Sequence, residues 1–203
     1  MKMKLYCSLT SPYARKVRVV AAELGLNDLI EESLIDPFVP SEEFLAANPL
    51  SKIPTLITDK GEALLDSSLI VEYLQTRGRG LAALPRGTKR WTALRRKQIA
   101  EGIIDAAVAS VMERRRPESI VYTGFLDRQA EVIRRAVETL NLEANALASD
   151  QPSVVEVSAG VALAYLDFRL PYLEWRRNNE VLGTWFSTFA LRPSMLATQP
   201  QAT

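Results

Sequence analysis

The chain has 203 residues, of which 47% are hydrophobic and 24% charged, a composition typical of a globular protein with one domain or two small ones. Its 25 basic and 24 acidic residues leave a net charge of +1, so no global field favours binding to nucleic acid or to an anionic membrane. A single cysteine excludes an internal disulfide, and the absence of histidine excludes histidine-based catalysis and histidine-bearing zinc sites.

The first expected elements are a strand and a helix. Apolar residues alternate with lysine and tyrosine from Met1 to Cys7, which predicts a strand. Apolar residues then recur at helical spacing from Tyr13 to Leu24, after an N-cap at Ser11 and a proline at position 12. The exposed amides at such a helix start favour an anion. On local sequence alone, capping is a sufficient role for Ser11.

Shorter elements follow in the next fifty residues. We expect an imperfect strand over 29–35 and a short helix over 41–47, which Asn48-Pro49 stops. Two apolar segments flank Asp59-Lys60-Gly61, a pattern that predicts a hairpin, and Asp66-Ser67 opens another helix. The order strand, helix, strand, helix, hairpin, helix predicts a small mixed sheet covered by helices.

The rest of the chain is predicted to be helical after a linker rich in Gly, Arg, Ala and Pro. The expected helices are a long one ending at Arg116, an unbroken apolar seam from Leu126 to Leu147, and a nearly all-apolar helix from a capping box at Ser153 and Glu156 to about Arg169. This last helix is too short to span a membrane, so it should be central. One or two closing helices over 173–189 have as their core candidates Trp175, Val181, Leu182, Trp185, Phe186 and Phe189. Residues 193–203 are expected to form a loosely packed tail.

Three segments together resemble a known family. They are Ser11-Pro12-Tyr13-Ala14-Arg15, the stretch NPLSKIPTL over 48–56, and the stretch LDSSLIVEYL over 65–74. In this order and spacing they resemble the glutathione-binding half of the cytosolic glutathione transferases, in their serine-type, bacterial-like form. The resemblance implies a thioredoxin-like α/β domain over 1–77, a linker over 78–87 and an all-helical domain over 88–203.

The resemblance also implies how glutathione would be held near its sulfur. Ser11 would be the catalytic residue, donating its hydroxyl proton toward the thiolate. Lys52 would lie near the glycyl carboxylate, and the backbone of Ile53 would pair with the cysteinyl unit like an added strand. Pro54 would follow a cis peptide bond. By their local patterns alone, Lys52 is a solvated loop lysine and Ile53-Pro54 a strand entry.

Two further groups complete the expected site. Asp66 and Ser67 would hold the γ-glutamyl end, although an N-cap pair is their simplest local interpretation. The electrophile would sit between the domains, against Leu9, Tyr13 and side chains near residues 102–112 of the long helix. The resemblance names glutathione as co-substrate, no metal, and a small hydrophobic electrophile as the second partner.

The leading prediction is a cytoplasmic, homodimeric glutathione S-transferase with a role in detoxification. The cytoplasmic location rests on the lack of a long apolar leader, since Lys2, Lys4 and Arg15 interrupt the N-terminal segment. One alternative is a non-catalytic glutathione-binding or regulatory module of the same fold. The other is a glutathione-dependent thiol reductase that uses Cys7, although Cys7 lies four residues before Ser11 and an inward-facing strand position suits it better.

Overall fold

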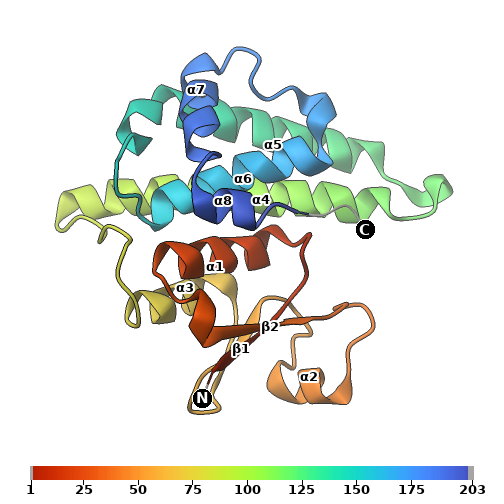
Figure 1. Cartoon of the computed structure of the whole chain (residues 1–203). Helices are drawn as coiled ribbons and strands as arrows, with labels where there is room; N and C mark the ends of the chain where they lie inside the picture. The colour runs from red at the N-terminus through yellow and green to blue at the C-terminus, as the bar shows by residue number, and fades with distance from the viewer. Residues whose placement is uncertain (1, 201–203) are drawn as a thin grey trace. The chain divides into compact units, whose positions relative to one another are not determined.

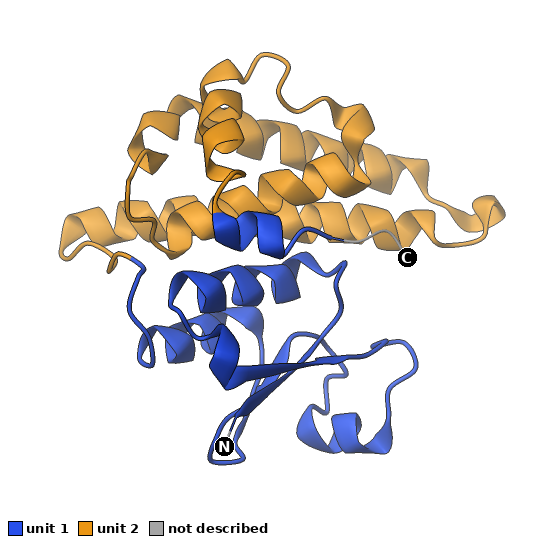
Figure 2. Ribbon diagram, in the orientation of Figure 1, with its two compact units in different colours: residues 1–81, 193–203 blue, residues 82–192 orange. Residues whose placement is uncertain are grey.

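The structure, a computed structural model, describes residues 2–200, and it divides into two compact units. Unit 1 contains residues 1–81 and 193–203, and unit 2 contains residues 82–192 (Figure 2). Met1 of the predicted first strand and residues 201–203 of the predicted tail lie outside the described part of the chain.

Unit 1 has the predicted order of elements, so the expected thioredoxin-like arrangement is confirmed (Figure 1). Its elements are β1 (Met3–Cys7), α1 (Pro12–Glu23), β2 (Ile30–Leu34), α2 (Glu42–Ala47), β3 (Thr55–Ile57), β4 (Ala63–Leu64), α3 (Ser67–Gln75) and α8 (Pro193–Ala197). A short 3₁₀ turn over Asn27–Leu29 precedes β2. Ser11 caps α1 with Pro12 as its first residue, as predicted.

The four strands form one mixed sheet in the order β2-β1-β3-β4. β1 and β2 are parallel, whereas β1 with β3 and β3 with β4 are antiparallel. Helices α1 and α3 pack against each other, and their apolar residues Val17, Val20, Ile70 and Leu74 are fully buried. The core of unit 1 therefore lies between this helix pair and the sheet.

Unit 2 is helical throughout its regular structure. Its long helices are α4 (Thr88–Arg114), α5 (Thr123–Leu142), α6 (Val154–Arg169) and α7 (Glu180–Phe189), joined in part by 3₁₀ turns at Glu118–Ile120, Ala144–Leu147 and Pro171–Leu173. Helix α4 packs along both α5 and α6. The capping box at Ser153 and Glu156 is confirmed, and twelve of the sixteen residues of α6 are buried, so α6 is central to the unit as expected.

Two predictions about unit 2 are wrong. The apolar seam from Leu126 to Leu147 is not one helix, because α5 ends at Leu142 and the 3₁₀ turn follows. That turn keeps Ala144 and Leu147 buried, since residues three apart share a face in a 3₁₀ helix. Val181 is 47% exposed and not in the core, because the buried face of α7 is formed by Leu182, Phe186 and Phe189.

The C-terminal segment also differs from the expectation. Residues 193–203 group with unit 1 and not with the helical domain, because α8 packs on α1. Met195 and Thr198 are buried there, so the described part of this segment is not a loose tail.

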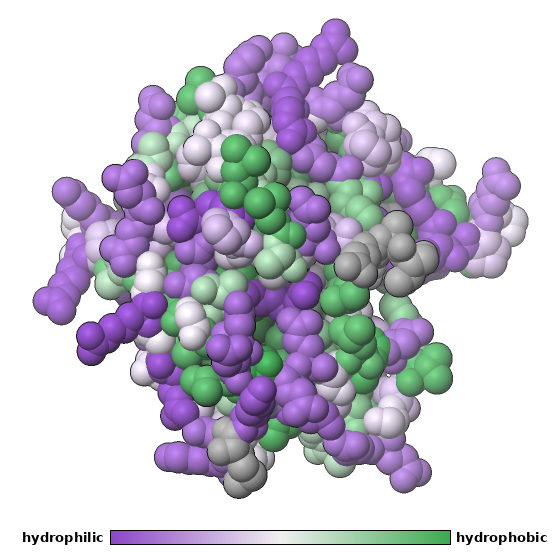
Figure 3. All heavy atoms as spheres, in the orientation of Figure 1, coloured by the Kyte–Doolittle hydropathy of each residue, from purple (hydrophilic) through white to green (hydrophobic). Residues whose placement is uncertain are grey.

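Within residues 2–200, no helix combines the length and the hydropathy needed to cross a bilayer. Figure 3 shows hydrophilic residues over much of the face that it presents, with hydrophobic residues in small groups between them.

Candidate functional site

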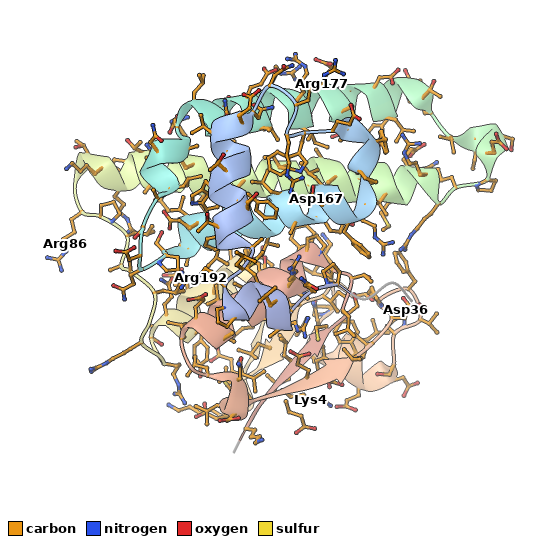
Figure 4. All side chains as sticks on the ribbon, turned by 45° about the horizontal axis from the view of Figure 1, so that its top comes forward. Lys4, Asp36, Arg86, Asp167, Arg177 and Arg192 are labelled. Carbon is orange, nitrogen blue, oxygen red and sulfur yellow. The ribbon has the colours of Figure 1, made fainter. Side chains whose placement is uncertain are left out.

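The sheet topology brings the predicted site segments of unit 1 to one end of the sheet. Tyr6 near the end of β1 pairs with Thr55 at the start of β3, and Leu56 pairs with Leu64 at the end of β4. Three connecting segments therefore lie at the same end of the sheet: the loop after β1, the loop before β3 and the turn after β4. The segment after β2, which begins with Ile35 and Asp36, starts there too, because Cys7 is opposite Leu34 (Figure 4).

Ser11 ends the loop that follows β1. Its backbone is extended, and its hydroxyl oxygen accepts a hydrogen bond from the Ala14 amide at 3.2 Å. The same side chain is half-buried. Because the contact uses only a lone pair of the oxygen, the hydroxyl proton remains available to an acceptor. The arrangement supports capping and donation to an anion at the same time.

A buried asparagine that sequence reasoning interpreted only as a helix stop organises the loop before β3. Asn48 is fully buried, and its amide nitrogen donates to the carbonyl oxygen of Lys52 and to Oγ1 of Thr55, both at 2.8 Å. Its side-chain oxygen accepts from the Leu50 amide at 2.9 Å. The position of Asn48 immediately before a proline, at the start of a loop, is the signal that could have indicated this turn-forming role.

This bracing shapes the backbone of the residues that would meet the ligand. The Ile53-Pro54 peptide bond is cis, as the resemblance implied. Ile53 is half-buried and Pro54 is buried, whereas the side chain of Lys52 is exposed. Ser51 adopts a left-handed conformation with φ of 50°, and its hydroxyl donates to the Pro37 carbonyl at 3.1 Å.

Asp66 and Ser67 open α3, as predicted. The Asp66 carboxylate accepts from the amides of Ser68 at 2.7 Å and Leu69 at 3.4 Å, so it is the N-cap. The side chain of Asp66 is nevertheless exposed, while Ser67 is only 4% exposed. The peptide bond between Leu65 and Asp66 is also cis. Because Asp66 already accepts from the amides of Ser68 and Leu69, a negative group of a ligand at this helix start would meet Ser67.

The two residues expected to touch the electrophile are both half-buried in unit 1. Leu9 belongs to the loop after β1, and Tyr13 lies in the first turn of α1. The remaining expected contribution, from residues 102–112, belongs to α4 of unit 2 and stays a prediction.

Cys7 has the environment of a core residue. Its side chain is fully buried in β1, which confirms the inward-facing position predicted for it. Burial, with a smaller contribution from Glu32, raises the pKa of the Cys7 thiol to about 12. The thiol is therefore protonated at neutral pH, and the thiolate that a reductase needs is missing.

Acidic and sulfur ligands do not gather into a metal centre in the described part of the chain. Among residues 2–200, no three side chains of the Asp, Glu, Cys or His type lie close enough to hold a metal ion. The predicted site residues near the sheet end offer hydroxyls, backbone amides, the Lys52 ammonium and the Asp66 carboxylate.

Known proteins resemble the chain over nearly its whole length. The family profile for the glutathione S-transferase N-terminal domain matches residues 5–80. The uncharacterized GST-like protein YibF of Escherichia coli K12 is 32% identical over 202 residues, which is 98% of each chain. A glutathione transferase family member from Pseudomonas fluorescens Pf-5, crystallised with bound glutathione, is 37% identical with a TM-score of 0.92, covering 99% of this chain and 100% of its own. A stringent starvation protein A homologue from Pasteurella multocida is 36% identical over 101 residues, 47% of this chain and 46% of its own.

Proposed function

Because the chain belongs to the glutathione transferase family, we propose that it binds glutathione at the sheet end of unit 1 and transfers it to a small hydrophobic electrophile. The full-length likeness to a family member crystallised with glutathione supports the ligand. The observation that carries the chemistry is the Ser11 hydroxyl, held at the start of α1 with its proton uncommitted by the capping bond.

Ser11 acts by stabilising the thiolate of bound glutathione. A free thiol with a pKa of about 8.5 is mostly protonated at pH 7, and lowering that pKa to about 7 requires roughly 2 kcal/mol. A hydrogen bond to a charged group contributes about 1.5–3 kcal/mol, and a helix N-terminus adds about 0.3–1 kcal/mol. Ser11 and α1 together supply this amount without a histidine base.

The rest of the tripeptide is held by groups at the same end of the sheet. The backbone of Ile53 pairs with the cysteinyl unit, and the exposed Lys52 reaches the glycyl carboxylate. Ser67 at the start of α3 takes the γ-glutamyl carboxylate, while the exposed Asp66 carboxylate, which caps the helix, takes the amine. The thiolate then attacks the electrophilic carbon, a C–S bond forms, and either a leaving group departs or the adduct takes up a proton.

A second candidate function is a regulatory module that keeps the fold without turnover. The specific observation in its favour is the similarity of half of the chain to a stringent starvation protein A homologue. The thiol reductase has no such support, because the Cys7 thiol is buried and its pKa is raised. A homodimer is expected under either function, and light scattering on the purified protein measures it.

Titration of glutathione by calorimetry and an assay with chlorodinitrobenzene test the proposal. We expect Ser11→Ala to lower turnover by about ten- to a hundredfold, which corresponds to 1.4–2.7 kcal/mol of transition-state stabilisation. Ser8→Ala is the matched control, since it removes a half-buried serine hydroxyl from the same loop. Normal thiolate formation in Ser11→Ala contradicts the role of Ser11, and binding without turnover on any electrophile favours the regulatory module.

A further inference from the structure

The segment that contains α8 is fastened to α1 through a buried arginine. Arg15 is 6% exposed, although it carries a charge. Its Nη2 donates to the carbonyl oxygen of Met195 at 3.0 Å, and its Nε donates to Oγ1 of Thr198 at 3.4 Å. Thr198 in turn donates to the Ser194 carbonyl at 2.8 Å, so the acceptor for Arg15 is itself held in place.

A second contact lies at the other end of α1. The Ser194 hydroxyl donates to the carboxylate of Glu23, the last residue of α1. Arg15 and Glu23 are eight positions apart, or about 12 Å along a helix. Ser194 contacts the last residue of α1 and Thr198 contacts its first turn, so α8 runs antiparallel to α1. Met195, between these two contacts, is 1% exposed.

The chemistry of the Arg15 contact is unusual for a contact that only adds stability. Buried charges in proteins are normally paired with opposite charges, and one left unpaired is destabilising. Within residues 2–200, both acceptors that the Arg15 guanidinium contacts are neutral oxygens. Burial, with a smaller contribution from Arg18, lowers the pKa of Arg15 to about 10. An apolar side chain would fill this space at lower electrostatic cost but could not donate to Met195 and Thr198, so the role of the guanidinium is to fasten these two residues to α1.

That role is connected to Ser11 by one turn of helix. The backbone amide of Arg15 donates to the Ser11 carbonyl at 2.9 Å, the first hydrogen bond of α1. The side chain of Arg15 therefore ties this first turn to residues 194–198, while its backbone ties the same turn to Ser11. A shift of α1 along or around its axis would move the Ser11 hydroxyl, whose hydrogen bond to a thiolate depends on position.

We propose that residues 194–198 form a clamp on α1, and that Arg15 is a positioning residue which, through this clamp, holds the Ser11 hydroxyl where it stabilises the glutathione thiolate. The inference rests on the proposed function, because it assigns to the C-terminal segment a part in the same thiolate site. It also identifies Ser194 and Thr198 as side chains that affect the chemistry without touching the ligand.

The test measures the pKa of the bound glutathione thiol by the ultraviolet absorbance of the thiolate, and glutathione affinity by calorimetry, in full-length variants. Arg15→Met should raise that thiol pKa by about one unit, from about 7 to about 8, which is about a fivefold loss of thiolate at pH 7, with glutathione affinity changed less than about threefold. Thr198→Val and Ser194→Ala should each cause about a two- to threefold loss of thiolate at pH 7. Thr198→Ser keeps the hydroxyl that accepts from Arg15, so it should behave like the parent protein. Arg18→Met, which breaks the ion pair of α1 with Glu32 at 2.7 Å, is the matched control.

The possible outcomes separate the clamp from the proposed function. If Ser11→Ala raises the thiol pKa while the Arg15, Thr198 and Ser194 variants leave it unchanged, the clamp is wrong and the proposed function stands. If Arg15→Met raises the thiol pKa but the Thr198 and Ser194 variants do not, the Arg15 charge acts directly on the thiolate and the clamp is wrong. If Ser11→Ala also has no effect, both fail. Should Arg15→Met not fold, the difference between Thr198→Val and Thr198→Ser decides.

Discussion

The polar side chains at the sheet end of unit 1 are used differently from the charged side chains of unit 2. In unit 2, charged residues mostly satisfy each other across or along helices, as in Arg134 with Glu131 and Glu138 and Arg96 with Glu143. Asp167, labelled in Figure 4, likewise accepts from Arg176 and from the Trp175 indole. Each such surface pair adds little to stability, about 0–1 kcal/mol, and leaves few groups for a ligand.

In unit 1, the polar side chains at the sheet end bind backbone instead. Ser11 and Asp66 cap helices, and Asn48 braces a loop. A side chain that shapes backbone leaves amides, carbonyls and a hydroxyl proton directed outward, and such groups recognise a peptide. The comparison teaches that the recognition proposed for unit 1 would depend on backbone geometry, whereas the fold of unit 2 depends mainly on apolar packing.

The largest expected effect comes from overpacking unit 2. A Cβ atom at Gly160 of α6 would fall on the Phe189 ring of α7. Gly160→Val should therefore lower the free energy of unfolding by about 3 kcal/mol, measured by urea denaturation. At a temperature where the variant stays folded, its glutathione affinity should be unchanged, because the site groups belong to unit 1.

A glycine in α4 provides the control for this substitution. No heavy atom lies within 4 Å of a Cβ placed at Gly102. Gly102→Ala should stabilise the protein by about 0.5–1 kcal/mol, since alanine has the better helix propensity. If Gly160→Val and Gly102→Ala lowered the free energy of unfolding equally, overpacking against Phe189 would not be the cause of the destabilisation.

The next effect concerns the braced loop of unit 1. Asn48→Ala removes three hydrogen bonds from a fully buried side chain, so it should lower the free energy of unfolding by about 2 kcal/mol. Unlike Gly160→Val, it should also weaken glutathione binding by about tenfold, because the Ile53 backbone loses its support. Calorimetry measures this, with Asn27→Ala at an exposed position as the control. Unchanged affinity in Asn48→Ala would contradict the link between bracing and recognition.

A smaller effect is expected from Cys7 at alkaline pH. Its folded pKa of about 12 lies above the value of about 8.5 for an unfolded thiol. Above about pH 9 the unfolded chain loses this proton first, so stability present below that pH is lost as pH rises toward 12. Between pH 9 and pH 10 the parent protein should lose up to about 1.4 kcal/mol more than Cys7→Ala. Parallel stability curves for the two proteins would show that the thiol is less buried than the structure indicates.

How far the sequence predicts this molecule depends on the range of each interaction. The helix starts at Ser11, Asp66 and Ser153 follow from residues within a few positions of each other, so local patterns predict them. The end of α5 at Leu142 is harder to predict, because the 3₁₀ turn that follows continues the same apolar spacing, so the sequence pattern shows no break.

Contacts between distant residues were not predictable in this way. Arg15 and Thr198 are 183 positions apart, and nothing near either residue indicates the pairing. The residues proposed for a glutathione site come from a family resemblance, because local patterns give each of them a simpler role. For the electrophile pocket, the only individual residues predicted were Leu9 and Tyr13, because apolar side chains that line a pocket cannot be distinguished in a sequence from those of the core.

The smallest effect comes from comparing the two serine N-caps. Ser153 accepts from the Val155 amide at 3.1 Å and, with its own amide donating to Glu156 at 2.7 Å, completes a capping box. Ser153→Ala should lower the free energy of unfolding by about 1 kcal/mol, and Ser11→Ala should lower it by a similar amount, because each removes one capping oxygen. Only Ser11→Ala should also raise the pKa of the glutathione thiol, since only that cap lies at the proposed sulfur site. If the two substitutions change both unfolding and thiol pKa alike, the hydroxyl at Ser11 acts through the stability of its helix and not through contact with sulfur.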